Sequence, residues 1–411
     1  MKKFQETLNV KFVEKQNLFK TKQFKLDKRL AGFYCYVTNF KNKTKISDIP
    51  IGYTIGAAVG TRKNNLRARS RYEAIERYCL YTKEISGIQF ECVSNTKKQY
   101  FPIKKCILYS PNQESKPDFP FLKRKSKEKI PWVKAKELNK TNIFLPYHYV
   151  FPQKRKNEIN RVDTWSTSGG ASHLSTVQAI INGVLELVER DTVMCSWISK
   201  SGISRIDINT INSKRLNKLI GLLKELEIIV FLFSAKNEFG ITTIIAALDK
   251  KDENFLSFGS ACKADIYIAV EKAIYEAIMI RNTQYQLIKH NLVKSSRGLL
   301  RHVAAPIIFG EKICLWLFDK NIKTEAINQI IGMQPKKDTE IVEIIKKNFR
   351  VFVFNYSDQK VSKKTKVVKC IAPQLHPLEL SSNLNHGDLK RVRQFANKSK
   401  IKTNYFIHPF G

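Results

Sequence analysis

A short pattern of acidic residues occurs twice in the 411-residue sequence, and it constrains the fold more than any other feature. RYEAIERYCL at 71–80 and VLELVERDTV at 184–193 both contain the pentapeptide E-x-x-E-R. Composition alone predicts far fewer than one occurrence in a chain of this length, so two copies are not accidental. Both stretches have the apolar spacing of helices, and we therefore expect two related helices that carry the same charged groups.

The spacing of the glutamates places them in pairs. Residues three apart lie on one face of a helix, so Glu73 is next to Glu76 and Glu186 is next to Glu189. The flanking residues are largely apolar, which predicts buried helices, and a buried carboxylate pair requires a compensating cation. Hard divalent ions such as Mg²⁺ bind carboxylate oxygens and commonly bridge to nucleotide phosphates. The repeat therefore predicts an oxygen-rich pocket between two helices.

Glycine-rich stretches precede both helices, GAAVG at 56–60 and SGG at 168–170, and their backbone N–H groups could bind phosphates. Arg77 and Arg190 could add phosphate contacts. The alternative for one isolated copy is that each arginine pairs with a glutamate of its own helix. The presence of two copies favours the phosphate site.

A third segment, AVEKAIYEAIMIR at 269–281, predicts another helix of the same site. Ala269, Ala273, Glu276 and Ile280 lie on one stripe of this helix. Small residues allow another backbone to approach closely, so the stripe would direct Glu276 into that contact. The alternative is an ordinary glutamate on the surface of a helix.

Strands and helices alternate along the chain, which is typical of an α/β or α+β fold. We expect a strand and a glycine turn at 51–65, IGYTIGAAVGTRKNN, followed by a helix that begins near Leu66. A capping-box pattern at Ser175 and Gln178 predicts the start of the second helix. The other predicted strands are 227–233, 242–248, 255–260, 313–318, 351–355 and 367–372, and the other predicted helices are 266–286 and 323–331.

The domain organisation follows from changes in composition. We expect an entry segment at 1–50 with short strands, followed by one catalytic domain at 51–411. Residues 94–160 are rich in lysine and proline, and this composition predicts a loop-rich surface insertion within that domain.

Several classes of protein are excluded by composition. The sequence has no apolar run long enough to span a membrane, and its N-terminus lacks the apolar core of a signal peptide. Its eight cysteines are far apart without a CxxC pair, which argues against a zinc ribbon or a disulfide scaffold and favours the cytoplasm. The net charge is +36, but lysine is spread along the whole chain, so nucleic acid is an unlikely ligand. A biased codon usage or an acidic peptide partner would also account for the charge.

Together, the three glutamate-bearing segments resemble the YcaO family. The first family segment is a glycine turn followed by A-x-x-E-x-x-E-R-Y, which matches Gly60 to Tyr78. The second matches S-T-S-G-x-A-x-H at 166–173 and then Ala179, Gly183, Glu186, Glu189, Arg190 and Asp191. The third matches Ala269, Ala273, Glu276, Ala277 and Arg281. The resemblance extends over about residues 50–411.

The resemblance implies an α/β fold of mixed sheets, with helices packed around a pocket for ATP and Mg²⁺. The Mg²⁺ ligands that it implies are Glu73, Glu76, Glu186, Glu189 and Glu276. The ATP contacts that it implies are Arg69, Arg77, Ser168, Asn182, Arg190 and Arg281.

The resemblance also implies an enzyme, an ATP-dependent peptide cyclodehydratase. In this reaction a Cys, Ser or Thr side chain of a ribosomally made precursor peptide, such as that of a bacteriocin, adds to a backbone carbonyl. ATP phosphorylates the resulting oxygen, and departure of phosphate leaves a thiazoline or oxazoline. Two alternatives stay open: a thioamide-forming or other accessory YcaO protein, and a non-catalytic binding or assembly subunit.

The C-terminal sequence favours the cyclising branch of the family. Azoline-forming members often end in a proline-rich tail such as H-P-F-P, and this chain ends IHPFG at 407–411. The resemblance implies that the tail docks near the active site, where His408 and the carboxylate of Gly411 would assist proton transfer. The alternative is a tail that packs only for stability.

Two departures from the family pattern lie within the matched segments. Arg69 and Ser70 replace a frequent Ser-Ala, which would alter the nucleotide contacts, and Met279 replaces a frequent glutamine. Among weaker candidates, His173 would contact phosphate or substrate, or else make a hydrogen bond at a helix start. Asp191 would orient Arg190, or else be solvated.

The resemblance further implies partner proteins. The sequence before Gly52 is too short for an E1-like or leader-binding domain, so we expect such a domain on a separate protein that delivers the precursor peptide. A flavin dehydrogenase that oxidises the rings and a homodimeric state are further possibilities.

Overall fold

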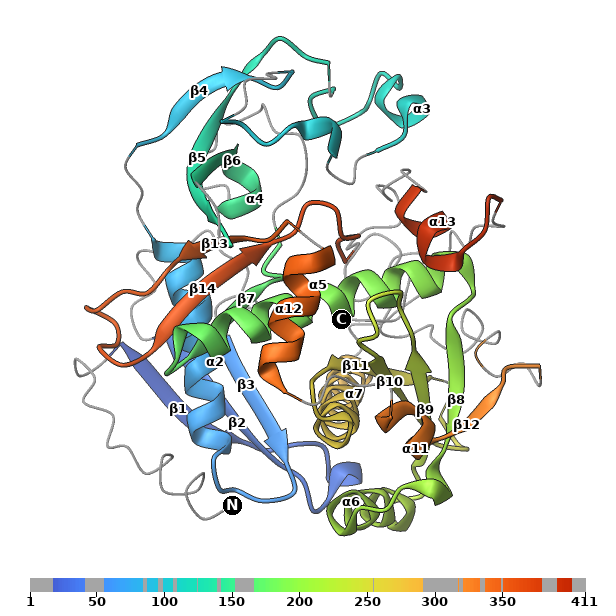
Figure 1. Ribbon diagram of the computed structural model, residues 1–411. Coiled ribbons are helices and arrows are strands. Elements are labelled where there is room, and N and C mark those ends of the chain that lie inside the picture. Colours follow the sequence, from blue (N-terminus) through green and yellow to red (C-terminus); the bar gives the residue numbers. More distant parts are fainter. Residues whose placement is uncertain are drawn as a thin grey trace.

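The computed structural model of the protein describes residues 18–40, 55–83, 87–94, 99–105, 109–123, 125–138, 142–151, 166–253, 255–290, 317, 321–332, 337–348, 350–378 and 390–400. Within these ranges it forms three sheets with helices between and around them (Figure 1). None of the described helices combines the length and the apolar character that crossing a membrane would require. The mixed α/β class predicted from the sequence is confirmed.

The first sheet is an antiparallel meander of β1 (Phe19–Phe24), β2 (Tyr34–Phe40) and β3 (Ile55–Gly60). Helix α2 (Leu66–Thr82) follows and packs against β3 and β2. Its start at Leu66 agrees with the sequence prediction. The short strands expected before Gly52 are present as β1 and β2, in which Phe19, Cys35 and Phe40 are buried.

The second sheet has the order β11-β10-β9-β8-β12. Its strands are β8 (Ile203–Asp207), β9 (Ile229–Ala235), β10 (Thr243–Asp249), β11 (Ser257–Cys262) and β12 (Thr324–Ala326). β9, β10 and β11 form an antiparallel meander, and β12 is parallel to β8. Helix α7 (Ile266–Lys289) packs on β11 and β10, and the side chain of Asp265 accepts hydrogen bonds from the first turn.

Helix α6 (Lys214–Glu225) connects β8 to β9 and packs against β9 through Leu216, Leu219 and Leu223. Their spacing of three and four residues gives an amphipathic helix with a basic outer face. Figure 1 shows α6 below the second sheet, on the same side as the turn between β3 and α2.

The third sheet has the order β4-β5-β13-β14-β7, and β6 pairs with β5. Its strands are β4 (Gln89–Cys92), β5 (Lys129–Glu137), β6 (Asn142–Pro146), β7 (Gly170–His173), β13 (Phe352–Asn355) and β14 (Lys366–Ile371). The short helices α3 (Pro111–Glu114) and α4 (Tyr147–Val150) accompany it. The loop-like prediction for 94–160 is therefore wrong at β5 and β6, because Trp132, Val133 and Leu145 are buried in this sheet. Whether 94–160 is an insertion stays a prediction.

Helix α5 (Thr176–Ser199) passes through the centre of the molecule, between the second and third sheets (Figure 1). It packs against β14 and β7 on one side and against β11 on another. Helices α12 (Asp338–Asn348) and α13 (Lys390–Ala396) cover it further. The side chain of Ser175 accepts a hydrogen bond from Gln178 N, so the predicted start of the helix is confirmed.

One predicted element differs and another lies outside the described residues. The predicted helix 323–331 is a strand, β12, followed by the short helix α11 (Ile327–Ile331). β12 adds to the edge of the second sheet, where Glu325 pairs with Lys236, the residue that follows β9. Most of the predicted strand 313–318 lies outside the described residues.

Candidate active site

The first glutamate pair extends from α2 in two directions. Glu73 Oε2 accepts a hydrogen bond from Ala57 N of β3 at 2.9 Å, and Glu73 Oε1 accepts from Arg77 Nη2 at 2.8 Å. Glu73 therefore joins the helix to its strand. Glu76 is half-buried beside Glu186 and the hydroxyl of Ser172, and burial followed by the charges of Glu186 and Glu73 raises its pKa to about 8.

In the second pair, on α5, a strand holds the later glutamate, Glu189, whereas in the first pair it holds the earlier one, Glu73. Glu189 is 7% exposed, and its two oxygens accept hydrogen bonds from Ser260 Oγ at 2.7 Å and from Cys262 N at 3.0 Å, both on β11. Glu186 Oε1 lies 3.8 Å from Arg190 Nη2 and is the member of this pair that approaches Glu76. Burial raises the pKa of Glu186, although Arg190 opposes the shift.

Glu276 belongs to the same group of carboxylates. Its Oε2 accepts a hydrogen bond from Ser260 N at 2.8 Å, the residue whose hydroxyl donates to Glu189. Burial and the neighbouring charge of Glu189 raise the pKa of Glu276 to about 7. The alternative of an exposed surface glutamate is therefore wrong for this residue.

Two cations lie among these carboxylates. Arg190 is surrounded by Glu189, Glu186 and Glu276, which raise the pKa of its guanidinium in spite of burial. Lys369 of β14 is 3% exposed, and burial lowers its pKa to about 8, although Glu186 and Glu76 oppose this. The lysine Nζ donates to the carbonyl oxygens of Ser166 and Ser168.

The glycine-rich loop before α5 is held against β14. Gly169 has φ +81°, and a Cβ there would collide with the carbonyl of Cys370, so glycine is needed at this close approach. The loop carries Ser168, one of the predicted ATP contacts, next to Lys369. Asn182, another predicted ATP contact, lies half-buried on α5 one turn before Glu186.

The arrangement fits a hard divalent cation through the chemistry of its donors. Burial disfavours the ionised forms of Glu76 and Glu186, and the charge of Glu186 adds to this cost at Glu76; a bound cation would offset that penalty. Among the described residues, no three His, Cys, Asp or Glu side chains are close enough to form a complete metal site. The protein groups therefore fit an ion whose coordination is completed by other oxygens, such as water or phosphate.

Some predicted residues have other partners. Arg281 is fully buried and donates to Leu248 O, Ser257 Oγ and Tyr285 Oη, because it lies on a different face of α7 from Glu276. The structure does not bring it to the carboxylates, and its role toward ATP stays a prediction. Arg77 is on the site's edge, where it pairs with Glu73. His408 and Gly411 lie outside the described residues.

Asp191 and His173 are explained by local structure. Asp191 is fully buried, accepts a hydrogen bond from His376 N at 2.7 Å and pairs with Arg391 of α13, so the prediction that it orients Arg190 or is solvated is wrong. The side chains of neighbouring positions on a helix point about 100° apart, which separates Asp191 from Arg190. His173 Nδ1 accepts from Ser175 N at 3.0 Å, the helix-start alternative.

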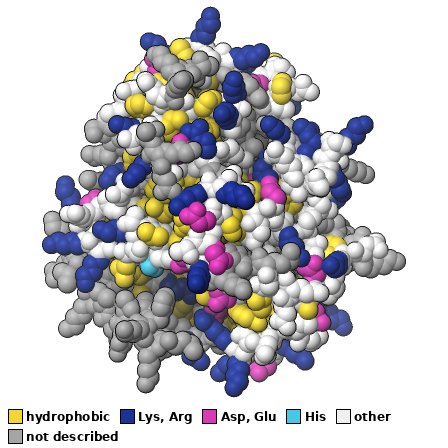
Figure 2. All heavy atoms as spheres, in the orientation of Figure 1, with side chains coloured by type: hydrophobic (Ala, Val, Ile, Leu, Met, Phe, Trp, Pro, Cys, Tyr) yellow, Lys and Arg dark blue, Asp and Glu magenta, His cyan; other side chains and the backbone are white. Residues whose placement is uncertain are grey.

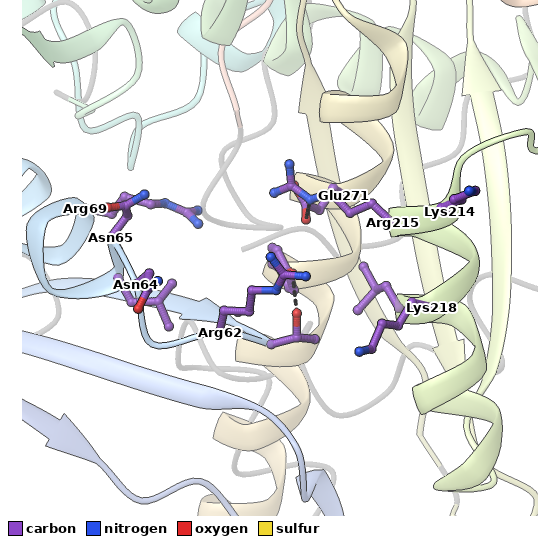
Figure 3. Close-up of a pocket in the computed structure, with 13 residues that line it drawn as sticks. Arg62, Asn64, Asn65, Arg69, Lys214, Arg215, Lys218 and Glu271 are labelled. Atoms are coloured by element: carbon purple, nitrogen blue, oxygen red, sulfur yellow. Dashed lines mark hydrogen bonds and ion pairs between the residues drawn. The ribbon is translucent and has the colours of Figure 1, made fainter. Parts of the chain in front are cut away.

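A cavity of about 680 Å³ lies next to α6 (Figure 3). It lies between the β3–α2 turn, α6 and α7. Arg69, predicted to contact ATP, lines this cavity four residues before Glu73. The structure therefore places Arg69 beside the glutamates rather than among them.

Two features of the site were not predicted from the sequence. They are Lys369 and the role of Ser260, which donates hydrogen bonds to both Glu189 and Glu276. A lone lysine in a basic chain has no distinguishing spacing, so no sequence signal pointed to Lys369. The contacts of Glu73 and Glu276 with strand amides could have been predicted, because the tetrapeptide Y-E-A-I occurs at 72–75 and again at 275–278. In both copies its glutamate accepts a hydrogen bond from a strand amide.

Comparisons with known proteins were made by sequence and by fold. The family model described as YcaO cyclodehydratase, ATP- and Mg²⁺-binding, matches residues 60–376. No curated protein matches the sequence. ATP and Mg²⁺ are thus the cofactors of the family whose model covers most of this chain.

Solved structures with similar folds include YcaO proteins and heterocyclases. A heterocyclase in complex with substrate and cofactor has a TM-score of 0.72 at 18% identity, covering 92% of this chain and 52% of that one. YcaO from Methanopyrus kandleri bound with AMPPCP and Mg²⁺ has a TM-score of 0.57 at 15% identity, with 86% and 84% covered. The E. coli microcin synthetase McbBCD complex has a TM-score of 0.63 at 13% identity, with 94% and 96% covered.

The chain spans about half the length of the first heterocyclase and of a second, TruD, of which it covers 45%. At these identities the likeness shows the fold alone. The match over residues 60–376 extends through all three glutamate-bearing helices, α2, α5 and α7. On that match, the chain belongs to the YcaO family.

Proposed function

We propose that this protein is an ATP-dependent cyclodehydratase that forms thiazolines or oxazolines in a ribosomally made precursor peptide. A Cys, Ser or Thr side chain adds to the preceding carbonyl, the new oxygen accepts the γ-phosphoryl group of ATP, and phosphate leaves with that oxygen. Family membership and the folds of known heterocyclases support this proposal. The observation that carries it is the approach of Glu76 and Glu186 from two different helices.

Mg²⁺ would neutralise charge on the transferring phosphoryl group when it is bound. We assign the ion to Glu76 and Glu186, because their charges have no strand amide that holds them as Ala57 N holds Glu73. Glu189 and Glu276 face the same space but are held by β11, so they would fix the geometry of the site and complete its charge. Arg190 and Lys369, which lie among these carboxylates, would bind phosphate oxygens.

Lys369 also has a positioning role in this proposal. Its ammonium group donates to two carbonyl oxygens of the loop that contains Ser166 and Ser168. The loop is therefore held at a fixed distance from β14, where its remaining backbone groups and Ser168 can contact a nucleotide. This predicts a site whose phosphate-binding loop is in place before ATP arrives.

A partner protein belongs to the same proposal. One structural neighbour is the McbBCD complex, and another is that complex with pro-MccB17 bound. By analogy, we infer that a separate leader-binding protein presents the precursor peptide to this chain. The flavin dehydrogenase, the homodimer and the role of His408 and Gly411 stay predictions.

The test is an assay of the purified chain with Mg²⁺, ATP and a Cys- and Ser-containing peptide, with and without a candidate leader-binding protein. We expect peptide-dependent release of phosphate and the loss of one water molecule from the peptide for each ring. Formation of a thioamide only when sulfide is added would support the other branch of the family. Absence of ATP hydrolysis under all these conditions, together with intact folding, would contradict the proposal.

A further inference from the structure

The cavity next to α6, here called the basic pocket, has an unbalanced charge. Its described lining residues include five cations and one carboxylate, namely Arg62, Arg69, Lys214, Arg215 and Lys218 against Glu271. In Figure 3, Arg62 and Arg69 extend into the cavity from the β3–α2 side, and Arg215 and Lys218 belong to α6 across from them. Cations from two separate parts of the chain therefore meet around one space.

Among the residues that the structure describes, only one of these cations is neutralised by an ion pair. Arg215 lies 2.5 Å from Glu271 Oε2 and 2.6 Å from Glu271 Oε1, which uses the single acidic side chain. In the described part of the chain, Arg62, Arg69 and Lys218 have no ion pair, and all three are exposed. Exposed cations that converge without counter-charges repel one another, and an anionic ligand would relieve this repulsion.

The charge excess continues from the basic pocket to the carboxylates. Lys272 follows Glu271 on α7. Repulsion by Lys263, with burial and Arg69, lowers its pKa to about 7. A ligand with negative charges would therefore be attracted to this part of the molecule.

We propose that the basic pocket binds acidic side chains of the peptide substrate. This inference rests on the proposed cyclodehydratase function. The peptide would carry at least two Asp or Glu residues close to the residue that is cyclised. Carboxylates match the observed groups, because guanidinium groups bind carboxylates through paired hydrogen bonds, and cations from two parts of the chain can bind the carboxylates of two separate side chains.

A nucleotide matches this pocket less well. The only carboxylate in its described lining, Glu271, is paired with Arg215, so the pocket offers no ligand for the Mg²⁺ that accompanies ATP. Tyr275, the one aromatic side chain of that lining, is 8% exposed and lies 3.5 Å from Thr61 Oγ1 through its hydroxyl. Little of its ring is available to stack on a base.

The distance between pocket and carboxylates sets the position of the acidic residues. Arg69 and Glu76 are seven residues apart on α2, which corresponds to about 10 Å along the helix. An extended peptide covers this distance with about three residues. The acidic residues should therefore lie about three to five residues from the reacting Cys, Ser or Thr.

The experiment measures direct binding, so that it does not depend on turnover. The probe is a fluorescein-labelled synthetic peptide with one cysteine and a Glu-Glu pair about three residues away, and its twin has Gln-Gln at the same positions. Fluorescence anisotropy with the full chain should show at least about tenfold tighter binding of the Glu peptide at low salt. This preference should decrease as salt is added.

The key variant is Arg62→Glu combined with Lys218→Glu, and the matched control is Lys224→Glu. Lys224 is also exposed on α6 but does not line the basic pocket. The double variant should lose the preference for the Glu peptide, and the control should keep it within about twofold. The milder pair Arg62→Gln and Lys218→Gln should give an intermediate loss, which tests the inference if the double reversal fails to fold.

Equal binding of the two peptides would overturn the inference, and so would an unchanged preference in the double variant. Displacement of the Glu peptide by ATP with Mg²⁺ in direct competition would contradict it as well. Stronger competition by a single-stranded oligonucleotide than by the Gln peptide would also overturn it, because it would identify a phosphate-backbone site. If the proposed function failed while the inference held, the protein would bind the Glu peptide selectively but would form no ring in any assay.

Discussion

Two parts of the molecule are built alike and differ at one functional position. The first unit is β1, β2, β3 and α2, and the second unit is β9, β10, β11 and α7. Each is an antiparallel meander followed by a helix that packs on the last strand. In each, a glutamate of the sequence Y-E-A-I, Glu73 or Glu276, accepts a hydrogen bond from an amide of that strand.

The packing of the helix on the strand is also repeated. A Cβ at Gly56 would lie closer than 3.0 Å to Ser70 O and Ala74 N, and a Cβ at Gly259 would do the same with the equivalent backbone atoms of α7. In both units glycine allows the helix to touch the strand, and this contact brings the glutamate to the amide. The shared glutamate thus helps to hold the helix against the strand in both units.

The difference lies three residues later on each helix. The first unit has Glu76, and the second unit has Met279, which packs against the core beside Cys35. The carboxylate at this later position of the helix, which approaches Glu186, is thus present in the first unit alone. The same packing of a helix on a strand is therefore present in both units. Only the first unit adds a carboxylate, Glu76, to which the proposed function assigns the cation.

The largest effect should come from Glu76→Gln. Removal of its charge should lower Mg²⁺-dependent ATP turnover at least ~100-fold, because the ion loses a ligand at the reacting phosphate. The melting temperature should not fall, since burial and Glu186 already penalise this charge. The matched change in the second unit, Met279→Gln, should leave turnover within about twofold. Similar losses in both variants would contradict the functional difference between the units.

The next effect concerns the shared packing. Gly56→Ala and Gly259→Ala should each lower the free energy of unfolding by at least about 2 kcal/mol, because the new methyl group meets backbone atoms that cannot move independently. Urea denaturation measures this effect. Gly221→Ala on α6 is the control: its Cβ would meet nothing within 4 Å, so stability should rise by about 0.5–1 kcal/mol. If only one of the two strand glycines were sensitive, the units would not share the same contact.

A smaller effect distinguishes the two strands. Ser260 of the second unit has Ala57 as its counterpart in the first, and only Ser260 donates a hydroxyl to a second glutamate, Glu189. Ser260→Ala should lower the free energy of unfolding by about 1.5–2 kcal/mol, because a buried charged group loses a hydrogen bond. Ala57→Ser should change it by less than about 0.5 kcal/mol. Thermal melting of both variants checks the prediction, and equal effects would contradict it.

The sequence was sufficient to predict the elements that carry the glutamates. α2, α5 and α7 are long, and their charged groups recur with helical spacing, so Glu76, Glu186 and Glu276 could be assigned to one pocket from the pattern. The strands β9, β10 and β11 are continuous apolar runs that are easily recognised.

Other features depend on contacts between distant segments, which a single sequence does not reveal. Lys369 is functional in this account only because β14 pairs with β7 beside the loop of Ser168. Asp191 follows Arg190 in the motif, yet its partner Arg391 is 200 residues away. The cations of the basic pocket come from two segments about 150 residues apart, and they are not exceptional in a chain with 72 Lys and Arg residues.

The most direct test of the central claim is the binding of a divalent ion with ATP to wild type, Glu76→Gln and Met279→Gln. Mn²⁺ can replace Mg²⁺ as a paramagnetic probe, and its electron paramagnetic resonance signal reports the free ion in the presence of ATP. We predict that Glu76→Gln weakens binding of the ion–nucleotide complex at least about tenfold, while Met279→Gln binds like wild type. Equal binding by all three proteins would contradict the claim that the first unit alone supplies this ligand.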